Sequence, residues 1–136
     1  MIQKRYSALL IEDNPICQQS QKFILEANGF RVDIVGTAKE AILALNRIEE
    51  KYNYINYDLI IVDFQLPDMW GDHLVDVIRL TERGDAYQKK LVIIAVMART
   101  DQLCTQRMCK SGVNHVVKKP MSQQDLVHVM PIINAE

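Results

Sequence analysis

The 136-residue sequence has no apolar run approaching the roughly 20 residues that a membrane-spanning helix needs. It also has no marked excess of charge. Its 17 acidic and 16 basic residues leave a net charge of −1, so nothing suggests a nucleic-acid or membrane-binding surface. Linkers, low-complexity tracts and internal repeats are absent as well. We therefore expect a single domain over residues 1–136, with a core from about residue 7 to residue 133.

Cysteine is scarce, with only Cys17, Cys104 and Cys109. The odd count, and a start that lacks the apolar segment of a secretory signal, predict a reducing compartment and hence a cytoplasmic location. No Cys/His pair stands at zinc-ligand spacing, which argues against a zinc site. A chain of this length can bury enough surface to fold without a disulfide or a structural metal.

Five short apolar segments are present, and amphipathic segments follow each of them. The predicted strands are residues 7–11, 30–35, 59–62, 91–96 and 113–117. Most of them are continuously apolar, which is typical of parallel strands covered on both faces. Regular alternation of strand and helix predicts an α/β fold, a doubly wound five-stranded parallel sheet with helices on both faces. We expect the strand order 2-1-3-4-5, which makes the first and third strands neighbours.

Helix boundaries are marked by capping residues and glycines. Asn14-Pro15 opens the first helix, and Ser122 caps the last one. In the first helix, apolar and small residues recur at helical spacing, namely Ile16, Ser20, Phe23, Ile24 and Ala27. Pro131 falls inside the last helix, so we expect that helix to end or bend near Met130.

Charged residues follow three of the predicted strands. Glu12 and Asp13 follow the first strand, Asp63 the third and Lys119 the fifth. Parallel strands place their carboxyl ends along one edge of the sheet, where ligands bind in open α/β folds. Taken singly, each residue has a simpler explanation as a helix cap, a turn residue or a solvated lysine. Their coincidence at strand ends favours a shared site.

Three carboxylates in one crevice repel each other. At ~5 Å and an effective dielectric near 20, each ionised pair costs about 3 kcal/mol. With Lys119 the group sums to −2, which a divalent cation would neutralise, and hard oxygen ligands at a partly open site suit Mg²⁺. The combination also fits a phosphoryl group on Asp63, with a carboxylate as nucleophile and Lys119 as a point-charge partner.

These residues lie in three motifs, Leu9-Leu10-Ile11-Glu12-Asp13-Asn14, Asp63 to Gly71 with Pro67 between them, and Lys119-Pro120. In order and spacing the motifs resemble the response-regulator receiver domains (CheY-like) of two-component signalling. The run Glu12-Asp13-Asn14-Pro15 further resembles the receivers of hybrid sensor histidine kinases, although Cys17 stands where those often carry Asn. The resemblance implies that Asp63 accepts a phosphoryl group from a phosphohistidine of a histidine kinase or histidine phosphotransfer protein.

The resemblance also implies roles for the other site residues. Asp13 would ligate Mg²⁺ (or Mn²⁺) directly, Glu12 would act through water, and the Gln65 backbone carbonyl would complete the protein ligands. Lys119 would pair with the phosphoryl group.

Two positions depart from the family pattern. Met97 stands where a Thr or Ser hydroxyl usually ends the fourth strand, and Val116 replaces the usual Tyr or Phe three residues before the lysine. Both belong to the family's usual conformational relay. We therefore expect the phosphorylation chemistry to be retained and the propagated switch to be weakened or rerouted. The face formed by the fourth helix, fifth strand and fifth helix is a possible protein contact.

Three functions other than that of a phosphoacceptor receiver share part of this pattern. A degenerate receiver would act as an interaction module without phosphorylation, and Met97 and Val116 leave that alternative open. An aspartate-nucleophile phosphatase is disfavoured because Gln65 stands where a second Asp would act as general acid. A flavodoxin-like cofactor binder is disfavoured because the strand-end loops carry carboxylates where an FMN phosphate needs donors. The chain is expected to be a stand-alone receiver or one excised from a kinase.

Overall fold

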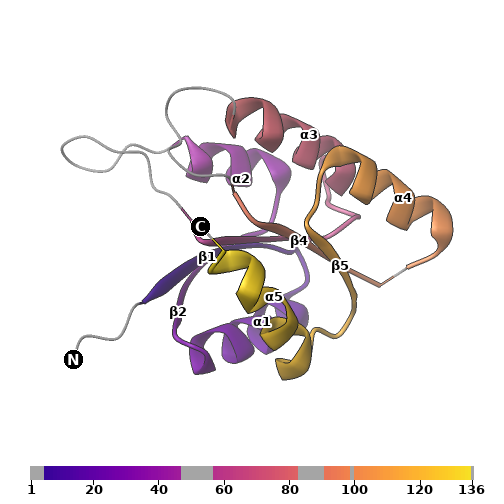
Figure 1. The fold of residues 1–136 in the computed structure, drawn as a ribbon. Coiled ribbons are helices and arrows are strands. Elements are labelled where there is room, and N and C mark those ends of the chain that lie inside the picture. The colour runs from indigo at the N-terminus through magenta and orange to yellow at the C-terminus, as the bar shows by residue number, and fades with distance from the viewer. Residues whose placement is uncertain (1–4, 47–56, 83–90, 99, 136) are drawn as a thin grey trace.

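The computed structural model describes residues 5–46, 57–82, 91–98 and 100–135. Within these residues strands and helices alternate (Figure 1). The strands are β1 (Tyr6–Ile11), β2 (Phe30–Val35), β3 (Leu59–Val62), β4 (Ile93–Met97) and β5 (His115–Lys118). The helices are α1 (Pro15–Ala27), α2 (Ala38–Leu45), α3 (Gly71–Glu82), α4 (Gln102–Ser111) and α5 (Gln123–Ile133). The predicted alternation is confirmed, with β4 and β5 shifted one or two residues towards the C-terminus.

All five strands form one parallel sheet in the order β2-β1-β3-β4-β5, as predicted. Strand β1 therefore pairs on one side with β2, where Leu10 aligns with Ile34, and on the other with β3, where Leu10 aligns with Ile61. The chain reverses its direction of winding between β1 and β3. The carboxyl ends of these two neighbouring strands thus lie side by side, at the position where this topology leaves a crevice.

Alternate residues of the strands pack into two separate hydrophobic cores, one on each face of the sheet. Leu9, Ile60 and Ile93 pack on the side covered by α2, α3 and α4. Leu10 and Ile61 pack on the opposite side, which α1 and α5 cover (Figure 1). This three-layer arrangement buries both faces of the sheet and explains why its strands are continuously apolar.

Several helix caps form as the sequence predicts. The Asn14 side chain accepts hydrogen bonds from the backbone N–H groups of Ile16 and Cys17, at 2.9 and 3.2 Å. Ser122 and Asp125 form a reciprocal capping box at the start of α5. These caps fix where α1 and α5 begin, and therefore the course of the loops that precede them.

Helix α1 turns part of its apolar pattern towards solvent. Ile16 is 80% and Phe23 75% exposed, whereas Leu25 and Gln21 are buried. Ile16 and Leu25 are nine residues apart, which at 3.6 residues per turn places them on opposite sides of the helix. The apolar spacing found in the sequence of α1 therefore includes residues from two faces of the helix. Only one of these faces packs against the sheet.

Helix α5 continues past Met130. Its last residue is Ile133, and the Asn134 N–H donates to the Met130 carbonyl at 3.0 Å. The helix therefore ends three residues after Met130, near which the sequence predicts an end or a bend. Pro131 lies in the last turn, where it removes one backbone hydrogen bond shortly before the helix ends. Among the described helices, none is both long and apolar enough to cross a membrane.

Candidate functional site

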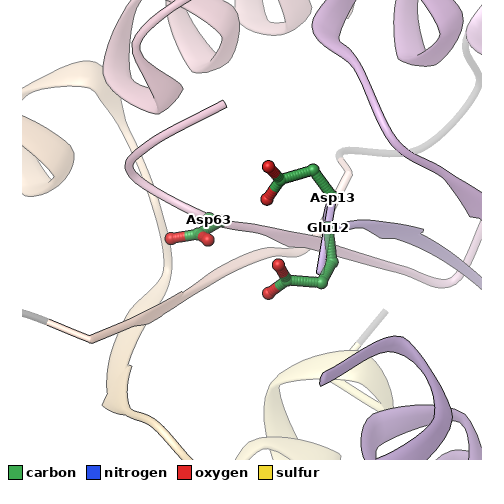
Figure 2. A group of neighbouring side chains, drawn as sticks. All are labelled: Glu12, Asp13 and Asp63. Carbon is green, nitrogen blue, oxygen red and sulfur yellow. The ribbon is translucent and has the colours of Figure 1, made fainter. Parts of the chain in front are cut away.

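The three predicted carboxylates meet at the carboxyl ends of β1 and β3. Glu12 and Asp13 follow β1, Asp63 follows β3, and one carboxylate oxygen of each lies within 4.8 Å of the others. Figure 2 shows the three side chains gathered around one space, with Asp13 and Glu12 on one side and Asp63 on the other. The proximity expected from the strand order is therefore present.

The surroundings of the three carboxylates differ. Glu12 is 1% exposed, and its Oε2 atom accepts a hydrogen bond of 3.0 Å from the Asn14 N–H. Asp63 is 9% exposed, whereas Asp13 is exposed. Glu12 is thus held in one orientation by the start of α1, and Asp13 forms the open side of the cluster.

Lys119 bridges two of these carboxylates. Its Nζ atom lies 2.8 Å from Asp63 Oδ2 and 2.5 Å from Glu12 Oε1. Burial of the ammonium group opposes its charge, but the hydrogen bonds to Asp63 and Glu12 outweigh that effect and raise the pKa of Lys119. The lysine therefore stays charged and offsets one of the three negative charges.

The loop after Asp63 folds back on itself. The Gly71 N–H donates to the Phe64 carbonyl at 2.6 Å, and Gln65 forms an isolated β-bridge with Trp70. A β-carbon at position 71 would clash with the carbonyl oxygen of Asp63, so only glycine fits there. Gln65, the residue expected to offer its backbone carbonyl, lies in this loop beside the carboxylates.

A cleft of about 550 Å³ opens over the cluster. Its lining joins residues that follow β1, β3, β4 and β5 with residues of α1 and α4. These residues are Glu12, Asp13, Asn14, Cys17, Asp63, Phe64, Gln65, Trp70, Ala98, Leu103, Cys104, Arg107 and Lys119. All the residues predicted to bind metal or phosphate therefore border one cleft.

Arg107 of α4 was not identified from the sequence. Its Nε and Nη2 atoms donate to the two carboxylate oxygens of Asp72, at 3.0 and 3.1 Å, and Asp72 is buried in the first turn of α3. The guanidinium carbon also lies 5.0 Å from the centre of the Phe64 ring and 5.9 Å from Trp70. No local signal in the sequence pairs Asp72 with a residue 35 positions later.

Met97 and Val116 occupy core positions. Met97 is fully buried and belongs to the same apolar cluster as Cys104 and Met108. Its carbonyl accepts a hydrogen bond of 2.8 Å from the Lys119 N–H. Val116 is half-buried and packs against that cluster. Neither side chain can donate a hydrogen bond towards the cleft.

The donor set suits a hard divalent cation. Three carboxylates offset by one ammonium leave a charge of −2, and one of the carboxylates remains open to solvent. Magnesium binds through one or two carboxylates and retains water, which matches an open site of this kind.

Known proteins share both this fold and its sequence pattern. Residues 8–130 match the sequence profile of the response regulator receiver domain. The chain belongs to this family. As a receiver domain it is a component of two-component phosphorelay signalling, and the similarity to the receiver family expected from the three motifs is confirmed.

Individual relatives lie in different kinds of protein. Over 121 residues the receiver is 30% identical to hybrid signal transduction histidine kinase D of Dictyostelium discoideum, covering 88% of this chain and 7% of that protein. An uncharacterized 14.6 kDa protein of Leptolyngbya boryana is 28% identical, with 90% of this chain and 85% of that protein covered. Several of the curated relatives are thus proteins of which this chain spans less than a tenth.

A solved structure also matches the whole receiver. It is the receiver domain of sensor histidine kinase PA1611 from Pseudomonas aeruginosa, described with a magnesium ion coordinated in its active site cleft. The two chains superimpose with a TM-score of 0.80 at 26% identity, covering 98% of this chain and 100% of the other.

Proposed function

We propose that this receiver accepts a phosphoryl group on Asp63 from a phosphohistidine, in a reaction that depends on Mg²⁺. The observation that carries the proposal is the placement of Asp63 within 4.8 Å of two further carboxylates while Lys119 donates to its Oδ2 atom at 2.8 Å. The residues from about 7 to 133 would act together as one receiver unit, working in the cytoplasm.

In the proposed reaction, a carboxylate oxygen of Asp63 attacks the phosphorus atom. The new P–O bond forms while the P–N bond to the donor imidazole breaks, and the bonding electron pair returns to the imidazole nitrogen. Lys119 binds an oxygen of the transferred group and keeps its charge throughout, consistent with its raised pKa. Water can later attack the acyl phosphate and regenerate Asp63.

The metal would be held by Asp13 and Asp63, with Glu12 acting through water and the Gln65 carbonyl completing the protein ligands. Bound Mg²⁺ supplies charge neutralisation for the phosphoryl oxygens. This assignment is supported by the acidic cluster and by the magnesium described in the PA1611 receiver. Mn²⁺ offers the same preference for oxygen ligands and would substitute for it.

The phosphohistidine donor would be a histidine kinase or a histidine phosphotransfer protein. This assignment is supported by the hybrid histidine kinases among the relatives of the chain. Signal output would differ from the usual relay, because Met97 provides no hydroxyl for the phosphoryl group and Val116 provides no aromatic ring. The face of α4, β5 and α5 remains a proposed protein contact.

Labelling with a small phosphodonor tests the proposal. We expect acetyl phosphate with Mg²⁺ to add one phosphoryl mass to the full chain, and the label to be removed by hydroxylamine, as an acyl phosphate is. D63N should take no label, and chelation of the metal should abolish labelling of the wild type. An unlabelled wild type that still binds a histidine phosphotransfer protein would instead support the phosphorylation-independent interaction module.

A further inference from the structure

Arg107 is the second cation on the cleft that contains Asp63. Among the described residues that line this cleft, the only basic side chains are Lys119 and Arg107. Lys119 already contacts both Glu12 and Asp63. Arg107 reaches the same cleft from α4, a helix on which none of the carboxylates lies.

A charge balance shows what phosphorylation would add. The three carboxylates, Lys119 and one divalent ion sum to zero. Converting the Asp63 carboxylate, with charge −1, into an acyl phosphate of charge near −2 leaves the cleft with about one uncompensated negative charge. Met97 supplies no donor at the end of β4, so a phosphoryl oxygen would lack a partner there unless another side chain provides it.

The guanidinium of Arg107 has N–H donors that are not used by Asp72. Its Nε–Nη2 edge faces Asp72, and the Nη1 atom has no hydrogen-bond partner among the described residues. A guanidinium carries five N–H groups in a rigid fork that matches phosphate oxygens. Arg107 can therefore bind a second anion while it remains attached to Asp72.

Its surroundings keep that fork in place. The rings of Phe64 and Trp70 lie against the guanidinium at 5.0 and 5.9 Å, with 5.3 Å between the two ring centres. Phe64 directly follows Asp63 in the chain. The Arg107 side chain therefore rests on the same loop that carries the phosphoacceptor, and a change at Asp63 would reach α4 through this contact.

We propose that Arg107 binds the phosphoryl group carried by Asp63 while it retains Asp72, and so links phosphorylation to helix α4 in a chain that lacks the usual hydroxyl and aromatic pair. The inference rests on the proposed function. Arg107 acts here as a phosphoryl-binding residue, and Asp72 is the positioning residue that orients its fork.

Beryllofluoride, a mimic of the bound phosphoryl group, provides the test. We expect R107Q, which removes the guanidinium charge and keeps a polar side chain, to bind beryllofluoride in the presence of Mg²⁺ about 10-fold more weakly than the wild type. Mg²⁺ alone should bind R107Q at least as tightly, because the lost charge is positive. R107K should lie between them, since an ammonium keeps the charge and loses the fork. D72N should weaken beryllofluoride binding less than R107Q.

Trp70 provides an independent signal, since it is the only tryptophan in the chain and lies against Arg107. We expect its fluorescence to change on beryllofluoride binding in the wild type and to change much less in R107Q. The control is R31A, which removes an arginine from an exposed ion pair with Asp33 on the edge strand and should match the wild type.

Three results would overturn the inference, and the first two separate it from the proposed function. Equal beryllofluoride affinity and equal Trp70 response in wild type and R107Q would overturn the role of Arg107, even if Asp63 is labelled by acetyl phosphate. Failure of the wild type to be labelled at all would overturn the proposed function, and the Arg107 inference with it. A purely structural role would weaken Mg²⁺ binding along with beryllofluoride binding and would also overturn the inference.

Discussion

Gly71 lies so close to the backbone of Asp63 that any β-carbon at position 71 would clash with the Asp63 carbonyl oxygen and come within 2.9 Å of the Phe64 Cα atom. These neighbours are backbone atoms of the phosphoacceptor loop, so they cannot move aside as a flexible side chain would. The first helical residue of α3 and the proposed phosphoacceptor are therefore fixed against each other.

We expect G71A to lower the free energy of unfolding by about 1–3 kcal/mol, because the added methyl group forces the loop to shift. The shift should also weaken Mg²⁺ binding, which depends on the placement of Asp63. Urea unfolding and metal titration measure the two effects. The matched control is G36A, since a β-carbon there would make only ordinary contacts with Glu40 and Asp13, at 3.8 and 4.0 Å. Equal losses in both variants would contradict the prediction.

Asp68 should make the stability of the fold decrease at acid pH. Its carboxylate accepts hydrogen bonds from the Ala38 and Lys39 N–H groups at the start of α2, at 2.8 and 3.0 Å, and these bonds lower the pKa of Asp68. Because the pKa of Asp68 is lowered in the folded protein, its carboxylate stabilises the fold fully at a pH above the ordinary carboxyl pKa. This stabilisation is lost as the pH falls through the pKa that Asp68 has in the folded protein.

We therefore expect D68N to melt at a lower temperature than the wild type near pH 7, and the difference to shrink once the pH falls well below 3.8, the ordinary pKa of this group. Thermal melts across this range test the prediction, with D76N as control because Asp76 is an exposed carboxylate of α3. A wild-type advantage over D68N that persisted at the lowest pH would show that the Asp68 charge is not its source.

Arg79 connects α3 with the segment just before β4 and with the loop before β5. It donates to the carbonyls of Gly112 (3.0 and 2.7 Å) and Leu91 (2.7 Å), and its Nη1 lies 2.9 Å from Glu82. We expect R79A to cost about 3–5 kcal/mol of folding free energy, because Glu82 and the carbonyls would lose a largely buried partner. R31A, at an exposed pair, should cost below about 1 kcal/mol. Chemical denaturation of both variants measures these losses. Similar losses of unfolding free energy in R79A and R31A would contradict the prediction.

Magnesium should stabilise the receiver by mass action. At about 100 times the dissociation constant, binding to the folded state alone adds ~2.7 kcal/mol. We expect D13N to abolish most of this gain, since Asp13 is the open carboxylate of the cluster, and D76N to retain it. Melting temperature against metal concentration measures the effect. An undiminished gain in D13N would remove Asp13 from the proposed ligands.

The sequence was sufficient to predict the sheet order and the meeting of Asp13, Asp63 and Lys119. The shared edge follows from short-range signals, because continuous apolar runs indicate buried parallel strands and charged residues directly after such runs must lie at one edge of the sheet. The strand order follows from the doubly wound fold type that the alternation favours. Helix caps such as Asn14 and Ser122 were equally predictable, because capping depends on the next three residues.

Features that depend on how a helix is rotated against its neighbours were not predictable. The outward direction of Ile16 and Phe23 depends on which face of α1 meets the sheet, and apolar spacing alone did not separate the two faces. The pairing of Arg107 with Asp72 depends on the packing of α4 beside α3. The close approach of Gly71 to Asp63 is a property of the folded loop, and in the sequence Gly71 could equally have been an ordinary turn residue.

The contact between Lys119 and Asp63 also has a consequence for the order of events during folding. The two residues are 56 positions apart, and β4 lies between their strands in the sheet. A folding intermediate in which β1 and β3 had paired before β5 arrived would gather the carboxylates without their ammonium partner. Lys119 reaches Asp63 only when β4 has paired with β3 and β5 has paired with β4. In a refolding experiment, the return of the Lys119–Asp63 contact would therefore report completion of the sheet rather than its initiation.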